Sequence, residues 1–417
     1  MTKCMQWTAM ALAAFSLAAP AVQAAEADTD ASQATTEITY SKQVSRLIQT
    51  NCQTCHNPNG VAPFSLMNYR QAKGWGKMIK EVVLDGRMPP WDANDAVGHK
   101  FSNNRSLSQE DKNAFASWVD NGTPRGDDAE LPAPVEYSTD WRIGTPDMVF
   151  EMPEEVTVDP TGVVPYQYFM TPTNFDEDKW IDMAECRPGN PKVVHHIIMF
   201  VRDPNQTTVR DERGQGFFDA FAPGTDPMIL ESGVARRIPK GATLVWQMHY
   251  TPTGKEEKDR SSFGIKFAKG PITTELATTE AINFSFNIPP KADNHRVEAD
   301  MTFETAAVIR SLSPHMHYRG KSFTYTLVYP DGREDLLLDV PNYDFNWQTT
   351  YELVEPINVP AGTKMHCVAH FDNSDKNPFN PDPDKTVSWG DQTWEEMMIG
   401  FFQLSWDSDN KQVAGDD

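Results

Sequence analysis

Residues 193–201 read VVHHIIMFV, a run in which β-branched residues dominate and two histidines stand side by side. Comparable apolar runs occur at residues 242–250, 322–329, 363–371 and 398–404. Proline and glycine, with 31 and 24 residues, break the chain between such runs. Strand-length runs separated by turn-forming residues are typical of antiparallel β-sandwiches. The sequence therefore predicts that the larger part of the chain folds as β-sandwich.

The region before residue 127 has a different texture, because its apolar residues recur at helical spacing. This spacing predicts a small all-α domain. Its stripes are Val44, Leu47 and Ile48; Trp75, Met78, Ile79, Val82 and Val83; and Phe115, Trp118 and Val119, with Ser108 as N-cap and Gly122 beyond the end.

The length of 417 residues suggests two to four domains. About 270 residues of strand-like sequence are too long for one sandwich, so two all-β domains are expected in tandem. The predicted order is a signal peptide at 1–24, a flexible leader at 25–39, the helical domain at 40–126, an acidic linker at 127–143, β-sandwiches at 144–275 and 276–409, and a tail at 410–417.

The N-terminus predicts export to the periplasm. Lys3 precedes the apolar run 7–19, and a small-residue cleavage site ends at Ala24. This run is too short to span a bilayer, so no membrane span is expected. The net charge of −22 disfavours nucleic acid as a partner. Solubility explains this charge better than docking to a basic electron carrier.

Residues 52–56 read CQTCH. Two thiols at this spacing can add to the vinyl groups of one haem, and His56 is then placed to bind the iron. A zinc site would need a second ligand cluster, and a thioredoxin-like pair a βαβ unit; the helical region offers neither. The motif predicts one covalent c-type haem held by Cys52, Cys55 and His56.

The sixth iron ligand is predicted to be Met88, in the stretch GRMPPW. The prolines bias the chain away from helix and make a rigid loop. The region resembles small class I cytochromes c, in which such a methionine is axial. Met67, Met78 and His99 are the alternatives.

Five histidines fall in three short motifs of the β-rich region. His195 and His196 are adjacent, so both can hold one metal only if the strand bulges or ends there. His249 follows in WQMHY. His315 and His317, in HMH, share one face of a strand and can chelate.

Together these motifs resemble the type II copper, ascorbate-dependent monooxygenases, the family of peptidylglycine α-hydroxylating and dopamine β-monooxygenases. VVHHIIMF, WQMHYTP, HMHYRGK and EEMMIGFF stand in the family's order over residues 144–405. The resemblance implies two jelly-roll-like domains and two coppers. One copper is held by His195, His196 and His249; the other by His315, His317 and Met397, with Met398 as runner-up.

The implied activity is hydroxylation of a C–H bond of a small-molecule substrate with O₂, and the haem domain would relay electrons from a periplasmic donor. The family's carboxylate-gripping residues are absent: Ser313, Ile399 and Phe401 stand at those positions. A peptide C-terminus is therefore not the expected substrate. Two rival functions are a copper-binding electron carrier, and a copper dehydrogenase that passes electrons to the haem.

Cys186 and Cys367 are predicted either to form a disulfide or to be buried thiols, with neither favoured. His366 and His370 flank Cys367, and strand alternation places both rings opposite its thiol. Structural roles are expected for these two histidines.

Overall fold

The computed structural model describes residues 37–137, 140–205 and 216–407. The predicted signal peptide, most of the leader and the tail at 410–417 lie outside the described residues. No helix in the described part of the chain is long and apolar enough to cross a membrane.

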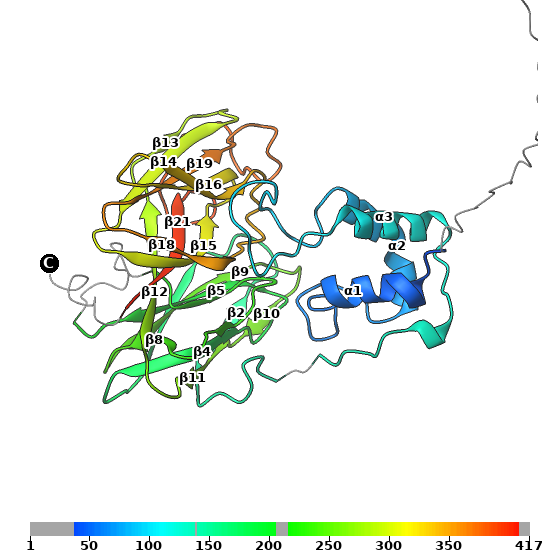
Figure 1. The fold of residues 1–417 in the computed structure, drawn as a ribbon, viewed down its shortest axis with the longest axis horizontal. Helices are drawn as coiled ribbons and strands as arrows, with labels where there is room; N and C mark the ends of the chain where they lie inside the picture. Colours follow the sequence, from blue (N-terminus) through cyan, green and yellow to red (C-terminus); the bar gives the residue numbers. More distant parts are fainter. Residues whose placement is uncertain (1–36, 138–139, 206–215, 408–417) are drawn as a thin grey trace, which may run out of the picture. The chain divides into compact units, whose positions relative to one another are not determined.

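Three α-helices form near the N-terminus, drawn in blue to cyan in Figure 1. Ser108 caps the third helix by accepting a hydrogen bond from the Asp111 backbone, and Gly122 has a φ of 82° beyond its end, as predicted. The elements are a π-helical turn η1 (Tyr40–Val44), α1 (Ser45–Asn51), α2 (Tyr69–Leu84), α3 (Gln109–Asp120) and a 3₁₀ turn η2 (Asp128–Glu130).

The helices share a core in which Ile48, Phe115 and Trp118 are fully buried. The stripe predicted on α2 is only half right. Ile79 and Val83 are buried there, whereas Trp75 and Met78 are 37% and 47% exposed.

The rest of the described chain is β-structure, as predicted, with alternating burial along many strands. The strands are β1 (Met148–Glu151), β2 (Val156–Val158), β3 (Gln167–Pro172), β4 (Lys179–Arg187), β5 (Val194–Arg202), β6 (Asp219–Phe221), β7 (Met228–Ile229), β8 (Val234–Ile238), β9 (Thr243–Tyr250), β10 (Glu257–Asp259), β11 (Ser262–Phe267), β12 (Thr274–Ile282), β13 (Asn287–Ile288), β14 (His295–Thr302), β15 (Ala307–His315), β16 (Gly320–Val328), β17 (Glu334–Val340), β18 (Tyr351–Val359), β19 (Lys364–Phe371), β20 (Val387–Ser388) and β21 (Ile399–Asp407).

One nine-stranded sheet runs through both halves of this region. Its order is β1-β11-β4-β8-β12-β21-β15-β18, with β7 beside β4. The predicted division near residue 275 falls on β12, and β12 pairs in parallel with β8, so the sheet is continuous there. The sheets β3-β9-β5-β6 and β14-β19-β16-β17 complete the two sandwiches, with the short pairs β10-β2 and β13-β20.

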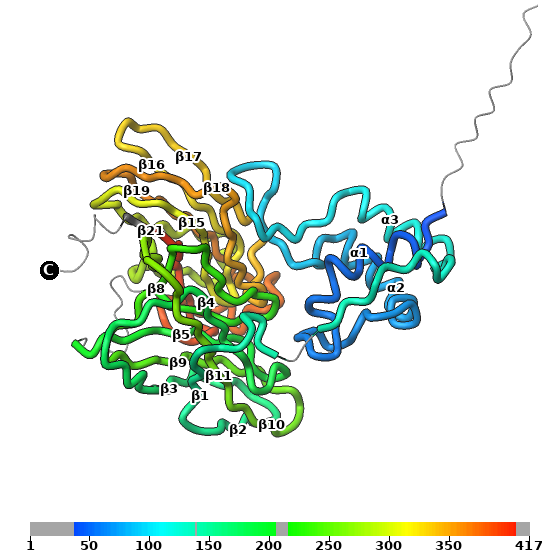
Figure 2. The backbone as a smooth tube through the Cα atoms, turned by 60° about the horizontal axis from the view of Figure 1, so that its bottom comes forward, coloured from blue at the N-terminus to red at the C-terminus, as the bar shows by residue number. Residues whose placement is uncertain are grey.

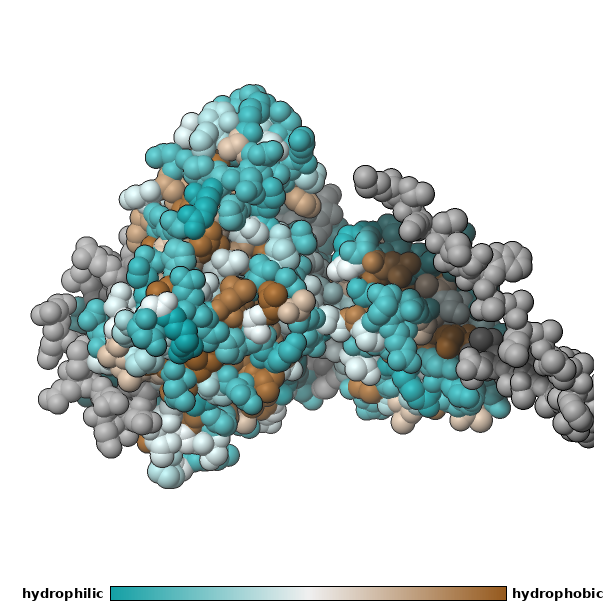
Figure 3. Space-filling view, turned by 45° about the horizontal axis from the view of Figure 1, so that its top comes forward, coloured by the Kyte–Doolittle hydropathy of each residue, from teal (hydrophilic) through white to brown (hydrophobic). Residues whose placement is uncertain are grey.

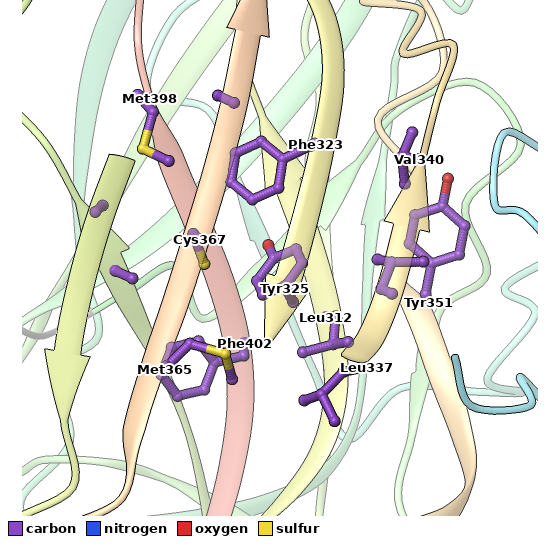
Figure 4. Packing of buried hydrophobic residues seen from close by; sticks show 14 of the residues in the cluster. Leu312, Phe323, Tyr325, Leu337, Val340, Tyr351, Met365, Cys367, Met398 and Phe402 are labelled. Atoms are coloured by element: carbon purple, nitrogen blue, oxygen red, sulfur yellow. The ribbon is translucent and has the colours of Figure 1, made fainter. Parts of the chain in front are cut away.

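The two four-stranded sheets lie at opposite ends of the β-rich part, as the labels of β3, β5 and β9 and of β16, β17 and β19 show (Figure 2). The larger core lies between β16, β19 and the strands β15 and β21 (Figure 4). Phe323, Tyr325 and Cys367 are fully buried there. Cys186 is also buried, and neither cysteine is in a disulfide, which leaves the buried-thiol alternative.

A segment between α2 and α3, residues 89–105, packs on the second sandwich. The Trp91 and Phe101 rings are buried in its core. Phe101 forms a β-bridge with Leu353, and the Asn94 backbone N–H donates to the Asp339 carbonyl at 2.8 Å. This docking segment, which directly follows Met88, anchors the helical region to the sandwich.

Candidate metal centres

The first candidate centre is the cluster of His195, His196 and His249. One potential donor atom of each imidazole lies within 4.8 Å of the other two. Neighbours on a regular strand would face opposite ways, but the register of β5 on β9 shifts between Val194 and His196. Of the two alternatives, a bulge or a strand end, the structure has an irregular register at this position, which brings both rings to the side of His249.

The ring nitrogens of this cluster are buried, and several lack hydrogen-bond partners, as expected of metal ligands. The Nδ1 atoms of His195, His196 and His249 are buried and make no hydrogen bond. Burial lowers the pKa of His249 to about 3 and holds that of His196 well below its usual range. Burial also lowers the pKa of His195, so the environment of all three rings favours the neutral imidazole, the state that binds metals. Buried ring nitrogens without partners are costly, and a metal ion would satisfy them.

The second candidate centre is built on the end of β15 and the start of β21. The His315 and His317 rings lie at right angles with centroids 5.2 Å apart. His315 Nδ1 bonds the Gln348 Oε1 atom at 2.7 Å, and His317 Nδ1 bonds the Glu395 carbonyl at 3.3 Å. Both contacts occupy the Nδ1 side, so Nε2 is the nitrogen that each ring can offer to a metal.

Met397 and Met398 lie just before β21, which begins at Ile399. Ile399 pairs with His315, and opposite residues of an antiparallel pair share a face. Continuing the alternation of the strand back by two residues predicts Met397 on the face of His315. Met398 is fully buried in the hydrophobic core that also contains Phe323 (Figure 4). Met397 is 2% exposed and is not part of that core.

The buried side chain of Glu396 fixes the backbone of the second centre through hydrogen bonds. Glu396 accepts hydrogen bonds from the backbone N–H groups of His317 and Arg319, at 2.8 and 2.6 Å. The Arg319 side chain is buried as well and donates to Asn373 and to the Trp394 carbonyl. Burial raises the pKa of Glu396 to about 8, although the hydrogen bonds from the Arg319 and His317 backbone lower it. The hydrogen bonds fix the HMH turn to the residue next to Met397.

Two aromatic rings separate the centres. The Tyr166 centroid lies 4.8 Å from that of His249 and 6.3 Å from that of His317. Phe345 stacks on His195 at 5.3 Å and lies 5.9 Å from His317. The Tyr166 hydroxyl is buried without a hydrogen-bond partner. Tyr166, Phe345 and Gln348 are not predicted from the sequence, because none belongs to a motif with ligand-like spacing.

The CQTCH motif forms a compact turn at the end of α1. The backbone N–H groups of Cys55 and His56 donate to the Cys52 carbonyl. His56 Nδ1 bonds the Phe64 carbonyl at 3.0 Å, which leaves its Nε2 atom for a metal. Both cysteines are free thiols. Phe64 in turn stacks on the exposed Trp75 at 4.1 Å.

Met88 lies beyond the end of α2, where its backbone N–H donates to the Val82 carbonyl. Trp75 and Met78 expose apolar surface on the same helix. Apolar, brown surface is visible on the helical part of the molecule (Figure 3). A flat apolar group such as a haem would cover surface of this kind.

Three of the other four histidines make contacts elsewhere. His366 bonds Asp300 and His370 bonds Ser322 on the outer face of β19, opposite the buried Cys367, as alternation predicted. His99 Nε2 contacts Asp335 at 3.1 Å from the docking segment.

A cavity of about 320 Å³ touches both centres, since His196 and His315 line it. Its walls are partly aromatic, with Phe217 and Phe401 in edge-to-face contact at 5.3 Å. A cavity of this size is typical of small-molecule sites.

No family model matches the chain, and no curated protein matches it. Among solved structures, the major capsid protein P2 of bacteriophage PM2 aligns with 63% of this chain and 99% of its own, at 8% identity and a TM-score of 0.25. The VP2 subviral particle of infectious bursal disease virus aligns with 64% of this chain and 73% of its own, at 10% identity and a TM-score of 0.21. A secreted protein from Eubacterium rectale aligns with 58% of this chain and 69% of its own, at 10% identity and a TM-score of 0.18. Similarities this low carry no argument about fold or function.

Proposed function

We propose that this protein is an exported, periplasmic copper-dependent monooxygenase that hydroxylates a small organic substrate and receives electrons through its own c-type haem. One observation carries the proposal. Two histidine clusters from different sandwiches face each other across Tyr166 and Phe345 and border one cavity. The overall reaction converts R–H, O₂, two electrons and two protons into R–OH and water.

The donor sets support copper at both centres. Copper supplies one-electron redox chemistry and a binding position for O₂ when it is bound. Imidazole suits both oxidation states, and the Met397 thioether favours the reduced state. Zinc and calcium sites do not select a thioether. His195, His196 and His249 would hold one ion, and His315, His317 and Met397 the other.

The chain's own groups set the geometry of these ligands. Gln348 and Glu395 orient the imidazoles of the second centre, and Glu396 holds the backbone between them. Tyr166 and Phe345 are buried and contact imidazoles of both centres, so they occupy space between them. The cavity beside His315 provides the position for a substrate.

The helical region fits a class I cytochrome c domain. The CQTCH turn presents two thiols and an oriented His56, and the loop with Met88 offers a soft sixth ligand. The haem would relay single electrons. The docking segment supports this role, because it runs directly from Met88 into the core of the second sandwich.

Metal content tests the copper assignment. We expect two coppers per chain, and about one after the double change His315→Ala and His317→Ala. X-ray absorption of the reduced protein should show a copper–sulfur distance that disappears in Met397→Ala and persists in Met398→Ala, the matched control. Loss of the sulfur signal in Met398→Ala alone would refute the assignment of Met397.

Oxygen consumption separates the three functions. A monooxygenase takes up O₂ only with substrate and places one ¹⁸O atom from ¹⁸O₂ in the product. An electron carrier forms no product. A dehydrogenase reduces the haem with substrate under anaerobic conditions and needs no O₂. Product that forms without label, or haem reduction by substrate alone, would refute the proposal.

A further inference from the structure

Two features of the cavity beside His315 indicate which kind of molecule it would bind. Both arginines on its walls are already engaged in ion pairs. Arg310 contacts Glu231 at 2.6 Å and Ser405, and Arg105 contacts Asp226 at 3.1 Å. A substrate carboxylate would therefore have to break an existing ion pair to find a cation here.

The second observation concerns the Gln348 side chain. Its Oε1 atom contacts His315 Nδ1 at 2.7 Å, and its Nε2 atom is buried without a hydrogen-bond partner. The orientation of this amide follows from the metal centre. If His315 binds a metal through Nε2, its Nδ1 carries the proton and requires the oxygen of Gln348. The amide N–H₂ group then remains as a hydrogen-bond donor without an acceptor. Gln348 lines the cavity, so a bound molecule can supply that acceptor.

A buried amide donor with no acceptor is unfavourable, and a ligand that supplies an acceptor relieves this cost. The aromatic walls formed by Phe217, Phe401 and Trp347 favour an unsaturated or apolar body. An acceptor bonded to Gln348 would hold that body beside His315.

We propose that Gln348 is the specificity-determining residue of this cavity, and that the substrate is a neutral, partly apolar molecule whose carbonyl, ether or hydroxyl oxygen accepts a hydrogen bond from Gln348 Nε2. This inference deepens the proposed monooxygenase function and rests on it. Gln348 thereby acts at both ends: its oxygen positions a metal ligand and its nitrogen positions the substrate.

The test measures binding of four probes of similar size to the full-length protein as purified, with its copper content recorded. The probes are acetophenone, ethylbenzene, benzoate and benzylamine, and saturation-transfer NMR gives their affinities. We expect acetophenone to bind about tenfold more tightly than ethylbenzene, the effect of one hydrogen bond worth about 1.4 kcal/mol. Benzoate should bind most weakly.

Three variants assign the effect. Gln348→Leu should remove the preference for acetophenone and leave ethylbenzene unchanged. Gln348→Glu keeps an oxygen for His315 but replaces the donor, so it should favour benzylamine. Gln403→Leu, the same change on β21 in the same cavity, is the control and should keep the preference. Equal losses in Gln348→Leu and Gln403→Leu, or strongest binding of benzoate by the unmodified protein, would overturn the proposal.

Copper content separates a failure of this inference from a failure of the proposed function. A protein that holds two coppers but shows no preference among the probes refutes the role of Gln348 alone. A protein that holds no copper refutes the monooxygenase, whatever it binds. Loss of the second copper in Gln348→Leu with retention in Gln348→Glu would support the oxygen contact to His315.

Discussion

Asp92 offers a quantitative test of how the docking segment sits on the second sandwich. It follows Trp91, and its carboxyl group accepts a hydrogen bond from the Asp344 backbone while the Asp344 carboxylate lies close by. Burial, and then repulsion by Asp344, raise the pKa of Asp92 from 3.8 to about 7. Replacing Asp92 with asparagine keeps an acceptor for the backbone N–H and removes the charge.

The sign follows from the number of protons bound by each state. Between about pH 4 and pH 7 the folded chain holds a proton on Asp92 that the unfolded chain has lost. Stability therefore falls as the pH rises through this window and is constant above it. Three pKa units correspond to about 4 kcal/mol, of which about 3 kcal/mol lie between pH 5 and pH 8. Partial solvent exposure of the side chain makes both figures upper limits.

Urea denaturation of Asp92→Asn and of the unmodified protein at pH 5 and pH 8 measures this effect. The variant should be nearly as stable as the unmodified protein at pH 5 and more stable at pH 8, by up to about 3 kcal/mol more than at pH 5. Asp331→Asn, at an exposed turn, serves as the control. Its stability difference from the unmodified protein should be the same at pH 5 and pH 8. A stability difference that is the same at both pH values would refute the buried environment of Asp92 and with it this docking geometry.

Three further changes test other parts of the structure. Glu396→Gln should lower the free energy of unfolding by about 1–3 kcal/mol in urea, because an amide nitrogen replaces one of the two oxygens that accept the His317 and Arg319 backbone N–H groups. Metal analysis should show loss of the second copper while the first remains. Trp91→Ala should lower the free energy of unfolding by about 3–5 kcal/mol, the usual cost of removing a buried indole, as measured in urea. Met88→Ala should leave the covalent haem in place but abolish the weak long-wavelength absorption of methionine–histidine ligation; a band that survives would exclude Met88 as the ligand.

The sequence predicts much of the local structure because local patterns decide it. Alternating burial along β19 and the cap at Ser108 depend on residues a few positions apart. The bulge beside His195 was likewise predictable, since two adjacent side chains cannot share a face on a regular strand. The exposure of Trp75 and Met78 was not predicted, because periodicity shows a stripe but not whether the chain or a bound group covers it.

Long-range features could not be predicted in this way. The parallel pairing of β8 with β12, which makes the sheet continuous, depends on contacts between segments about 40 residues apart and leaves no local pattern. Tyr166 and Gln348 are ordinary residues in their own segments. Their roles can be recognised only once β5, β9 and β15 have brought the histidines together.

The loop that leads into β18 shows why the two centres and the docking segment are best treated as one unit. Phe345 contacts imidazoles of both centres, Gln348 holds His315, and Asp344 faces Asp92. Tyr343, at the start of the loop, also bonds both backbone groups of Met316, between the two histidines of the second centre. A displacement of the docking segment would therefore move side chains that orient ligands in both centres. Because protein interiors are close-packed, such a displacement is not absorbed locally. It follows that a change in the docking segment beside Met88 can alter metal binding without touching a ligand.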